Sequence, residues 1–122
     1  MPSFLHSLAS PARFQRIANA IMPWAVLLAA GLIGTGVVWG LAFSPPDYQQ
    51  GDTVRVMYIH VPAAWMAMAC YAVMALLSAS FLIWKHQLAD LAARACAPIG
   101  ACFTAVALIT GSLWGKPTWG TW

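Results

Sequence analysis

Three long apolar runs alternate with short polar stretches along the chain. They cover residues 21–43, 61–84 and 95–114, and none of them contains a charged side chain. A transmembrane helix needs about 20 mostly apolar residues to cross the roughly 30 Å hydrocarbon core of a bilayer. The pattern therefore predicts an all-α fold, a polytopic transmembrane helical bundle with three spans in this chain.

A proline sets the expected start of the second span. Apolar residues already begin at Met57, and a helix from there to Trp84 would be longer than the core requires. Proline is favoured in the first helical turn, where its missing N–H is not needed. We therefore expect the helix to begin near Val61 or Pro62, which leaves His60 at its mouth, close to the membrane surface.

Polar or turn-forming residues separate the spans within what we expect to be a single membrane domain over residues 1–122. Residues 11–20 are typical of a short amphipathic helix, and the glycines and proline after Trp114 argue against continuation of the third helix. The parts outside the spans are, in order, a lead (1–20), a loop (44–56), a short connection (85–94) and the start of a tryptophan-rich segment (115–122).

The composition agrees with insertion into a membrane. Apolar residues make up 61% of the chain and charged residues only 7%, whereas about a quarter of the residues in soluble domains are charged. The net charge of +3 is small and scattered, so it does not predict the clustered basic surface that nucleic-acid binding needs. The three cysteines lie in apolar runs without a CxxC or CxxCH motif, which favours small buried side chains over a redox pair or covalent haem attachment.

The basic residues indicate an orientation, because Lys and Arg are enriched in cytoplasmic loops. A cytoplasmic N-terminus places four of the six basic residues inside and two outside: Arg13, Arg16, Lys85 and Arg94 against Arg55 and Lys116. With three spans, His60 and the tryptophan-rich segment lie on the same side of the membrane in either orientation. Under the charge rule that side is the periplasm.

The first span is rich in glycine. Gly36 and Gly40 form a small-xxx-small pair, a spacing that lets two helix backbones approach closely. We expect this face to pack against another helix.

His60 is the one histidine associated with a span, because His6 and His86 lie among polar residues. A histidine near a bilayer is costly unless it has a partner, and is therefore a functional candidate. Two interpretations fit it: an interfacial histidine satisfied by hydrogen bonds, or a ligand for iron or another metal. No second histidine or cysteine is expected beside it on the outer surface, so a closed metal site within this chain is not predicted.

Three of the seven tryptophans, Trp114, Trp119 and Trp122, lie close together at the end of the sequence. One interpretation is an aromatic belt at the membrane interface. The other is a platform for a flat ligand that also includes Gly115 and Gly120, since tryptophan offers a wide apolar face and one N–H donor.

An imidazole beside flat aromatic faces is the combination that haem binding needs, a ligand for iron and apolar contact for the porphyrin. Arg55 and Lys116 could meet the propionates through charged hydrogen bonds, or serve only as membrane-flanking charges. Nothing in the chain indicates an enzyme, since it has neither a Ser-His-acid set, nor paired carboxylates, nor a phosphate-binding glycine loop.

Two segments resemble the haem exporter protein C family of bacterial cytochrome c maturation: Asp47–Trp65 (DYQQGDTVRVMYIHVPAAW) and Gly111–Trp122 (GSLWGKPTWGTW). This family belongs to the haem-handling membrane proteins, which share a WGxxWxWD signature. Residues 119–122 match the first four positions of that signature. The loop, the YIHVPAAW segment and the tryptophan run occur in the family's order and spacing.

The resemblance implies a six-span protein in the bacterial inner membrane, with a cytoplasmic N-terminus, of which this chain would be an N-terminal fragment holding the first three spans. It implies haem b bound non-covalently at the periplasmic face by two histidines, the first at His60 and the second in a later loop outside this sequence. It also implies three kinds of partner: a periplasmic haem chaperone that receives the haem, subunits of an ATP-binding-cassette complex, and a small membrane accessory subunit.

We therefore expect a haem-binding membrane protein that holds haem at its outer face and delivers it to the chaperone. The alternative is a structural membrane subunit or permease component with an interfacial aromatic belt and no haem. A third possibility, an intramembrane haem b electron carrier, predicts histidines deep within helices, and the expected position of His60 argues against it.

Overall fold

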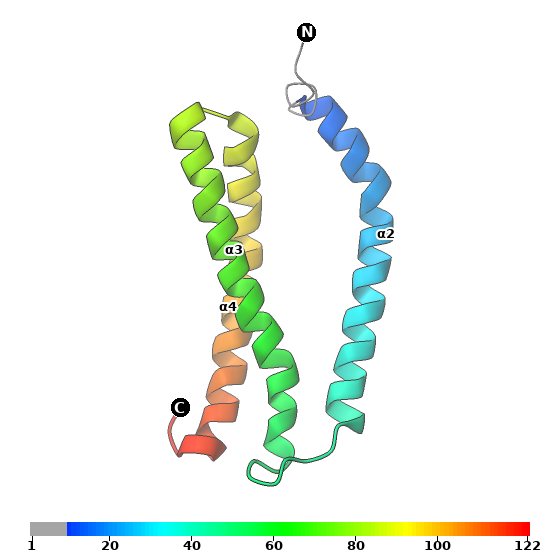
Figure 1. Cartoon of the computed structure of the whole chain (residues 1–122), viewed down its shortest axis with the longest axis vertical. Coiled ribbons are helices and arrows are strands. Elements are labelled where there is room, and N and C mark those ends of the chain that lie inside the picture. Colours follow the sequence, from blue (N-terminus) through cyan, green and yellow to red (C-terminus); the bar gives the residue numbers. More distant parts are fainter. Residues whose placement is uncertain (1–9) are drawn as a thin grey trace. The chain divides into compact units, whose positions relative to one another are not determined.

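The computed structural model describes residues 10–122, and this part of the chain is helical, with no strand (Figure 1). Its elements are, in order, α2 (Pro11–Val38), the π-helical turn η1 (Trp39–Phe43), the 3₁₀ helix η2 (Asp52–Val56), α3 (Met57–Trp84) and α4 (Gln87–Trp119). The first nine residues of the expected lead lie outside the described residues. The predicted all-α class is confirmed.

All three long helices can cross a membrane. Helix α2 with η1 covers Pro11–Phe43, η2 with α3 covers Asp52–Trp84, and α4 alone covers Gln87–Trp119. Each of these segments has 33 residues and is apolar enough to span. At 1.5 Å per residue such a segment is about 50 Å long, which exceeds the roughly 30 Å core, so its ends reach the interfacial layers. The protein is thus a multi-pass membrane protein.

Helix α2 begins at Pro11, in the position that proline favours at a helix start. It continues without interruption through the expected span and contains Pro23. Residues 11–20 are therefore not a separate amphipathic helix, and that prediction was wrong. The cause is that residues 12–22 contain neither a glycine nor a proline that would stop a helix.

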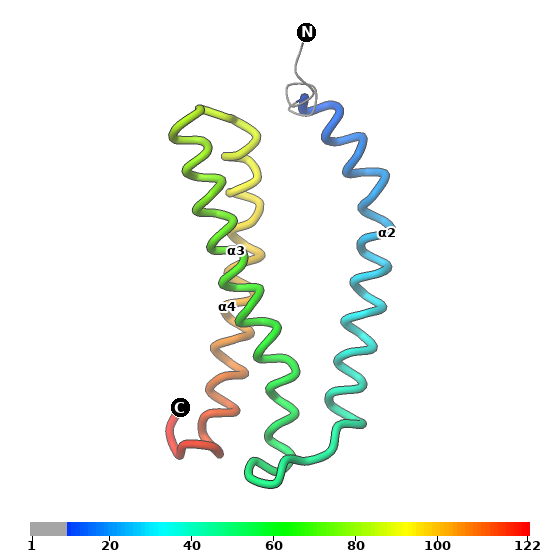
Figure 2. The backbone as a smooth tube through the Cα atoms, viewed as in Figure 1, coloured from blue at the N-terminus to red at the C-terminus, as the bar shows by residue number. Residues whose placement is uncertain are grey.

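Helices α3 and α4 form an antiparallel hairpin, and they lie side by side along its length (Figures 1 and 2). Only Lys85 and His86 join them, and Lys85 makes the turn with φ 53° while its N–H bonds to the carbonyl of Phe81 at 2.8 Å. The expected connection over 85–94 is therefore mostly helix. Its alanines favour helix, and Asp90 and Arg94 pair at 2.9 Å one turn apart.

Small residues set the contact within this hairpin. The buried apolar side chains are Ala63, Cys70, Ala89 and Ala93. A Cβ added to Gly100 would lie 3.0 Å from the Cβ of Cys70, so glycine permits the close approach of α4 to α3 there without a shift of Cys70. Close packing of small residues is the usual basis of helix association in membranes.

The prediction for Gly36 and Gly40 holds for one of the two. Gly40 is buried against Tyr58, whose Cβ would lie 2.9 Å from an added Cβ, whereas Gly36 has nothing within 4 Å. The packed position is the one in η1, next to the loop that leads to α3.

The predicted start of α3 and the predicted end of α4 need correction. Helix α3 starts at Met57, not at Val61 or Pro62, because η2 winds directly into it and Pro62 removes one N–H near its N-terminus. Helix α4 runs through Gly115 and Pro117 to Trp119 and ends at Gly120, whose φ of 77° is the left-handed conformation typical of a helix C-terminus. The predicted break after Trp114 was wrong, because one glycine and one proline near a helix end are tolerated.

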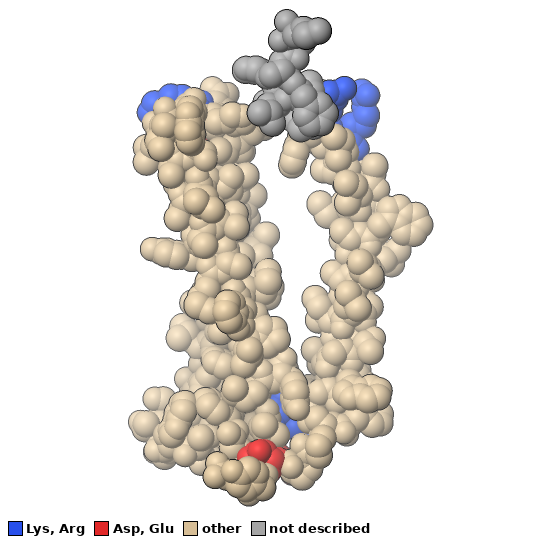
Figure 3. Space-filling view, viewed as in Figure 1, with Lys and Arg blue, Asp and Glu red and all other residues tan. Residues whose placement is uncertain are grey.

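Charged side chains lie near the ends of the hairpin, and the middle visible in Figure 3 is uncharged. Lys85, Asp90 and Arg94 lie near the α3–α4 turn, and Asp52, Arg55 and Lys116 lie near the opposite end. This opposite end, which contains the start of α3 and the end of α4, is called the His60 end below.

Candidate functional site

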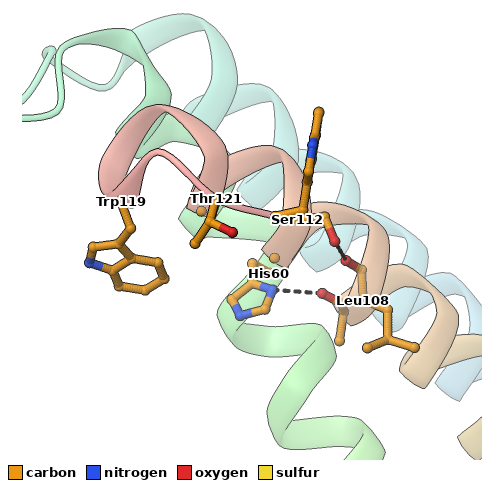
Figure 4. A pocket seen from close by; sticks show the side chains of 9 residues that line it. His60, Leu108, Ser112, Trp119 and Thr121 are labelled. Carbon is orange, nitrogen blue, oxygen red and sulfur yellow. Dashed lines mark hydrogen bonds between the residues drawn. The ribbon is translucent and has the colours of Figure 1, made fainter.

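A pocket of about 280 Å³ opens at the His60 end of the hairpin. His60 comes from the first turn of α3, and the other lining residues come from the last turns of α4 and the short segment after it (Figure 4). They include Leu108, Ser112, Trp119, Thr121 and Trp122. The pocket therefore joins the predicted histidine and two of the three predicted tryptophans.

The ring of His60 is held against one turn of α4. Its Nδ1 lies 3.0 Å from the carbonyl oxygen of Ala107 and 3.1 Å from Oγ1 of Thr110. The other ring nitrogen, Nε2, points away from this turn (Figure 4). Of the two interpretations, the hydrogen-bonded histidine is observed, and Nε2 has no hydrogen-bond partner within residues 10–122.

Gly111 makes this position of the ring possible. A Cβ at Gly111 would lie 2.9 Å from Cε1 of His60, closer than such contacts occur. Gly111 is one helical turn after Ala107, whose carbonyl accepts the hydrogen bond, so the Nδ1–Cε1 edge of the ring faces a strip of α4 that has almost no side chain.

Trp114 lies beside His60 but does not line the pocket. The two rings are nearly parallel, with centroids 6.5 Å apart and an interplanar angle of 19°. The other neighbour of Trp114 is Trp119, in an edge-to-face pair at 4.6 Å. Trp114 also donates a hydrogen bond from Nε1 to Oε1 of Gln50 at 2.9 Å. It connects the histidine, a pocket-lining tryptophan and the loop before α3.

The chain turns back on itself after α4. Gly120 has the positive φ that permits the turn, and the carbonyl oxygen of Thr121 then lies over Gly115, 3.4 Å from where a Cβ would be. Trp119 and Trp122 remain 67% and 74% exposed, so each still offers an open apolar face. Gly115 and Gly120 thus act through the backbone, one by allowing contact and one by allowing the turn.

The two predicted propionate contacts are not among the residues that line the pocket. Nη2 of Arg55 donates to the carbonyl of Ser44 at 3.1 Å and pairs with Asp52 at 3.3 Å. The ammonium of Lys116 lies 5.1 Å from the ring centre of Trp122, a cation–π contact that keeps it at the pocket's edge. Lys116 thus contacts a residue that lines the pocket, whereas the printed partners of Arg55, Ser44 and Asp52, do not line it.

The loop before α3 presents Gln50 in a fixed geometry. Asp47 Oδ1 accepts the backbone N–H groups of Gln49 and Gln50, both at 2.9 Å. Asp47 and Gly51 exchange backbone hydrogen bonds, and Gly51 has φ 58°. This tight turn, rather than a flexible loop, directs the Gln50 side chain toward Trp114.

The residues of α4 that contact the His60 ring were not predicted from the sequence. Ala107, Gly111 and Gly115 recur every fourth position and lie on one face of α4, which is the small-xxx-small spacing recognised only in the first span. Applied to the third span, that spacing would have marked the strip on which His60 lies. Gln50 carried no comparable signal, because its partner lies 64 residues away.

Comparison with known proteins gives one consistent family. Residues 4–122 match the family model described as "Heme exporter protein C". The chain belongs to the Heme exporter protein C family. The matched range contains every residue of the pocket, and the predicted family is confirmed.

Relatives of this family from several bacteria are similar over almost the entire chain. The Heme exporter protein C of Escherichia coli K12 is 48% identical over 118 residues, which are 97% of this chain and 48% of that protein. The proteins of that name from Bradyrhizobium diazoefficiens and Haemophilus influenzae are 49% and 48% identical, over 97% and 100% of this chain and 44% and 50% of their own length. The chain therefore spans about half the length of these relatives.

Proposed function

We propose that the full-length protein containing this chain binds haem b non-covalently at the His60 end and delivers it to a periplasmic haem chaperone. The observation that carries the proposal is the orientation of His60, whose Nδ1 is anchored to α4 while Nε2 is free beside exposed tryptophans. The names of the relatives add that proteins of this family handle haem.

The residues present fit haem as a ligand. A neutral imidazole nitrogen is a common axial ligand of haem iron, and Leu108, Trp119 and Trp122 offer apolar surface to a porphyrin. The volume of about 280 Å³ is at the lower limit of ordinary ligand pockets, which are about 300–1,000 Å³. This size suits a surface that receives one side of the macrocycle, with a second histidine supplied from outside this chain.

The three tryptophans would have two different roles, contact with the ligand and support of His60. Trp119 and Trp122 would touch the ligand, because they line the pocket and are exposed. Trp114 would act from behind His60, because it stacks on the imidazole and is fixed by Gln50. Lys116 is the better candidate for a propionate contact, and Arg55 would first have to leave its pair with Asp52.

The proposal places the His60 end in the periplasm and the N-terminus in the cytoplasm of a bacterial inner membrane. The charge asymmetry supports this side, with four basic residues against two. The partners would be the chaperone, subunits of an ATP-binding-cassette complex and a small membrane accessory subunit. No catalytic residue is assigned, because binding and release are sufficient for delivery.

The test is an absorption spectrum of the full-length protein purified from haem-replete cells, with His60→Ala and His86→Ala compared. His86 is exposed at the opposite end of the hairpin and serves as the matched control. We expect a Soret band in the wild type and His86→Ala, and its loss or shift in His60→Ala. Delivery is measured as covalent haem on the co-expressed chaperone, which should fall with the Soret band. A wild type without haem would favour the structural-subunit alternative.

A further inference from the structure

The surroundings of His60 Nδ1 contain two oxygen atoms and both act as acceptors. The carbonyl of Ala107 can only accept, at 3.0 Å. The hydroxyl of Thr110 has one hydrogen, and its shortest contact is a 2.6 Å bond to the carbonyl of Val106. Oγ1 of Thr110 therefore presents a lone pair, not a hydrogen, to Nδ1 at 3.1 Å.

Two acceptors around one nitrogen determine the tautomer. An unprotonated Nδ1 would set its lone pair against the Ala107 carbonyl at 3.0 Å, which is unfavourable, whereas Nδ1–H satisfies the contact. A neutral imidazole carries one N–H, so the lone pair is then on Nε2. Both acceptors belong to the same turn of α4, so they fix the direction of the ring as well as its proton.

We propose that Thr110 is a positioning residue for His60: together with the Ala107 carbonyl it keeps Nδ1 protonated and presents Nε2 as the nitrogen that ligates iron. The identity of the metal as iron rests on the proposed function. The tautomer of His60 does not, because it follows from the contacts of Nδ1. Thr110 does not line the pocket, so it acts through His60 and not on the ligand.

The contact has a chemical consequence for the ligand nitrogen. Donation of the second N–H to an oxygen makes a histidine a stronger electron donor, and loss of such a partner usually costs 10–100-fold in metal affinity. Removing the Thr110 oxygen takes away one of two acceptors, so we expect a loss of about tenfold, the lower end of that range. A weaker donor stabilises ferric iron less, so the reduction potential of the bound haem should rise.

The chain offers a matched pair of variants. Thr110→Val removes the acceptor at nearly constant volume, and Thr110→Ser restores it. Thr104→Val is the control, because Thr104 is on the same helix and its hydroxyl makes the same kind of bond to a backbone carbonyl, that of Gly100 at 2.8 Å, away from the pocket. In the full-length protein, we expect weaker haem binding and a higher potential only for Thr110→Val, with recovery in Thr110→Ser.

A measurement without haem tests the tautomer directly. In haem-free full-length protein labelled with ¹⁵N-histidine, the His60 signals, identified by their loss in His60→Gln, should show a protonated Nδ1 and a bare Nε2. The opposite tautomer would overturn the proposal, as would equal effects of Thr110→Val and Thr104→Val. If His60→Ala leaves the Soret band unchanged, the haem-ligand assignment fails instead, and the tautomer measurement still tests whether Nδ1 is the protonated nitrogen.

Discussion

The indole N–H of Trp114 and the side-chain oxygen of Gln50 form a hydrogen bond of 2.9 Å between residues 64 positions apart. It joins the end of α4 to the loop before α3, at the point where Trp114 stacks on His60. The loop is thereby part of the site, although it does not line the pocket.

Gln50→Leu should loosen Trp114 without disturbing the turn, because the turn is held by Asp47 and the backbone. A neutral hydrogen bond contributes about 1 kcal/mol, so we expect haem affinity to fall by about fivefold. The measurement is a haem titration of the full-length protein. Gln49→Leu is the control, since Gln49 uses only its backbone N–H in this turn. An equal loss in both variants would contradict the role assigned to Gln50.

Gly111→Ala should displace the His60 ring, because the new Cβ would lie 2.9 Å from Cε1. Overpacking of this kind costs about 1–3 kcal/mol, and here the ring is the part that can move. We expect an altered Soret band and at least a severalfold loss of haem. Gly34→Ala, which meets nothing within 4 Å, should retain the wild-type spectrum. If the two variants have the same spectrum and the same haem retention, the close approach of Gly111 to the His60 ring is not required for haem binding.

Trp119→Ala should weaken haem binding while leaving the hairpin folded, since Trp119 is 67% exposed and contributes little to packing between α3 and α4. An aromatic contact is worth about 0.5–1.5 kcal/mol beyond its buried area. We therefore expect haem affinity to fall by about two- to tenfold. Affinity and thermal unfolding should be measured together. Trp84→Ala, 71% exposed at the other end of α3, provides the comparison. Undiminished binding in Trp119→Ala would favour an aromatic belt.

Gly120→Ala should disturb the turn that brings Thr121 and Trp122 to the pocket. Alanine at a φ of 77° costs about 1–2 kcal/mol, and asparagine, which tolerates this conformation, costs less. We expect reduced haem retention in Gly120→Ala and partial recovery in Gly120→Asn. Limited proteolysis near the end of α4 should be fastest in Gly120→Ala, slower in Gly120→Asn and slowest in the wild type. An unchanged Gly120→Ala would mean that the position of Trp122 is unimportant.

The three spanning helices of residues 10–122 could be predicted because each span is a long uncharged run. The end of α3 at Trp84 was predicted as well, but the start of α3 and the end of α4 could not be, because the rules for glycine and proline describe preferences and not stops. Pro62 and Pro117 each remove one N–H near a helix end, where few hydrogen bonds depend on it, so α3 and α4 simply continue. Gly120 does end α4, because it adopts the left-handed conformation at the C-terminus of that helix.

The site was predictable in part for a different reason. Two spans lie between His60 and the tryptophans, and an even number of crossings places both at the same end, in agreement with the stacking of His60 on Trp114. The individual contacts depend on side-chain direction. The sequence alone could not distinguish Trp114, which supports the histidine, from Trp119 and Trp122, which border the open space.

The two-residue turn between α3 and α4 has a consequence for how the site is assembled. Every residue that lines the pocket lies in this one helical hairpin or in the three residues that follow it. Pairing of these two neighbouring helices therefore brings the lining residues of the pocket together. The order of synthesis then matters: this pocket can form as soon as the hairpin has entered the bilayer.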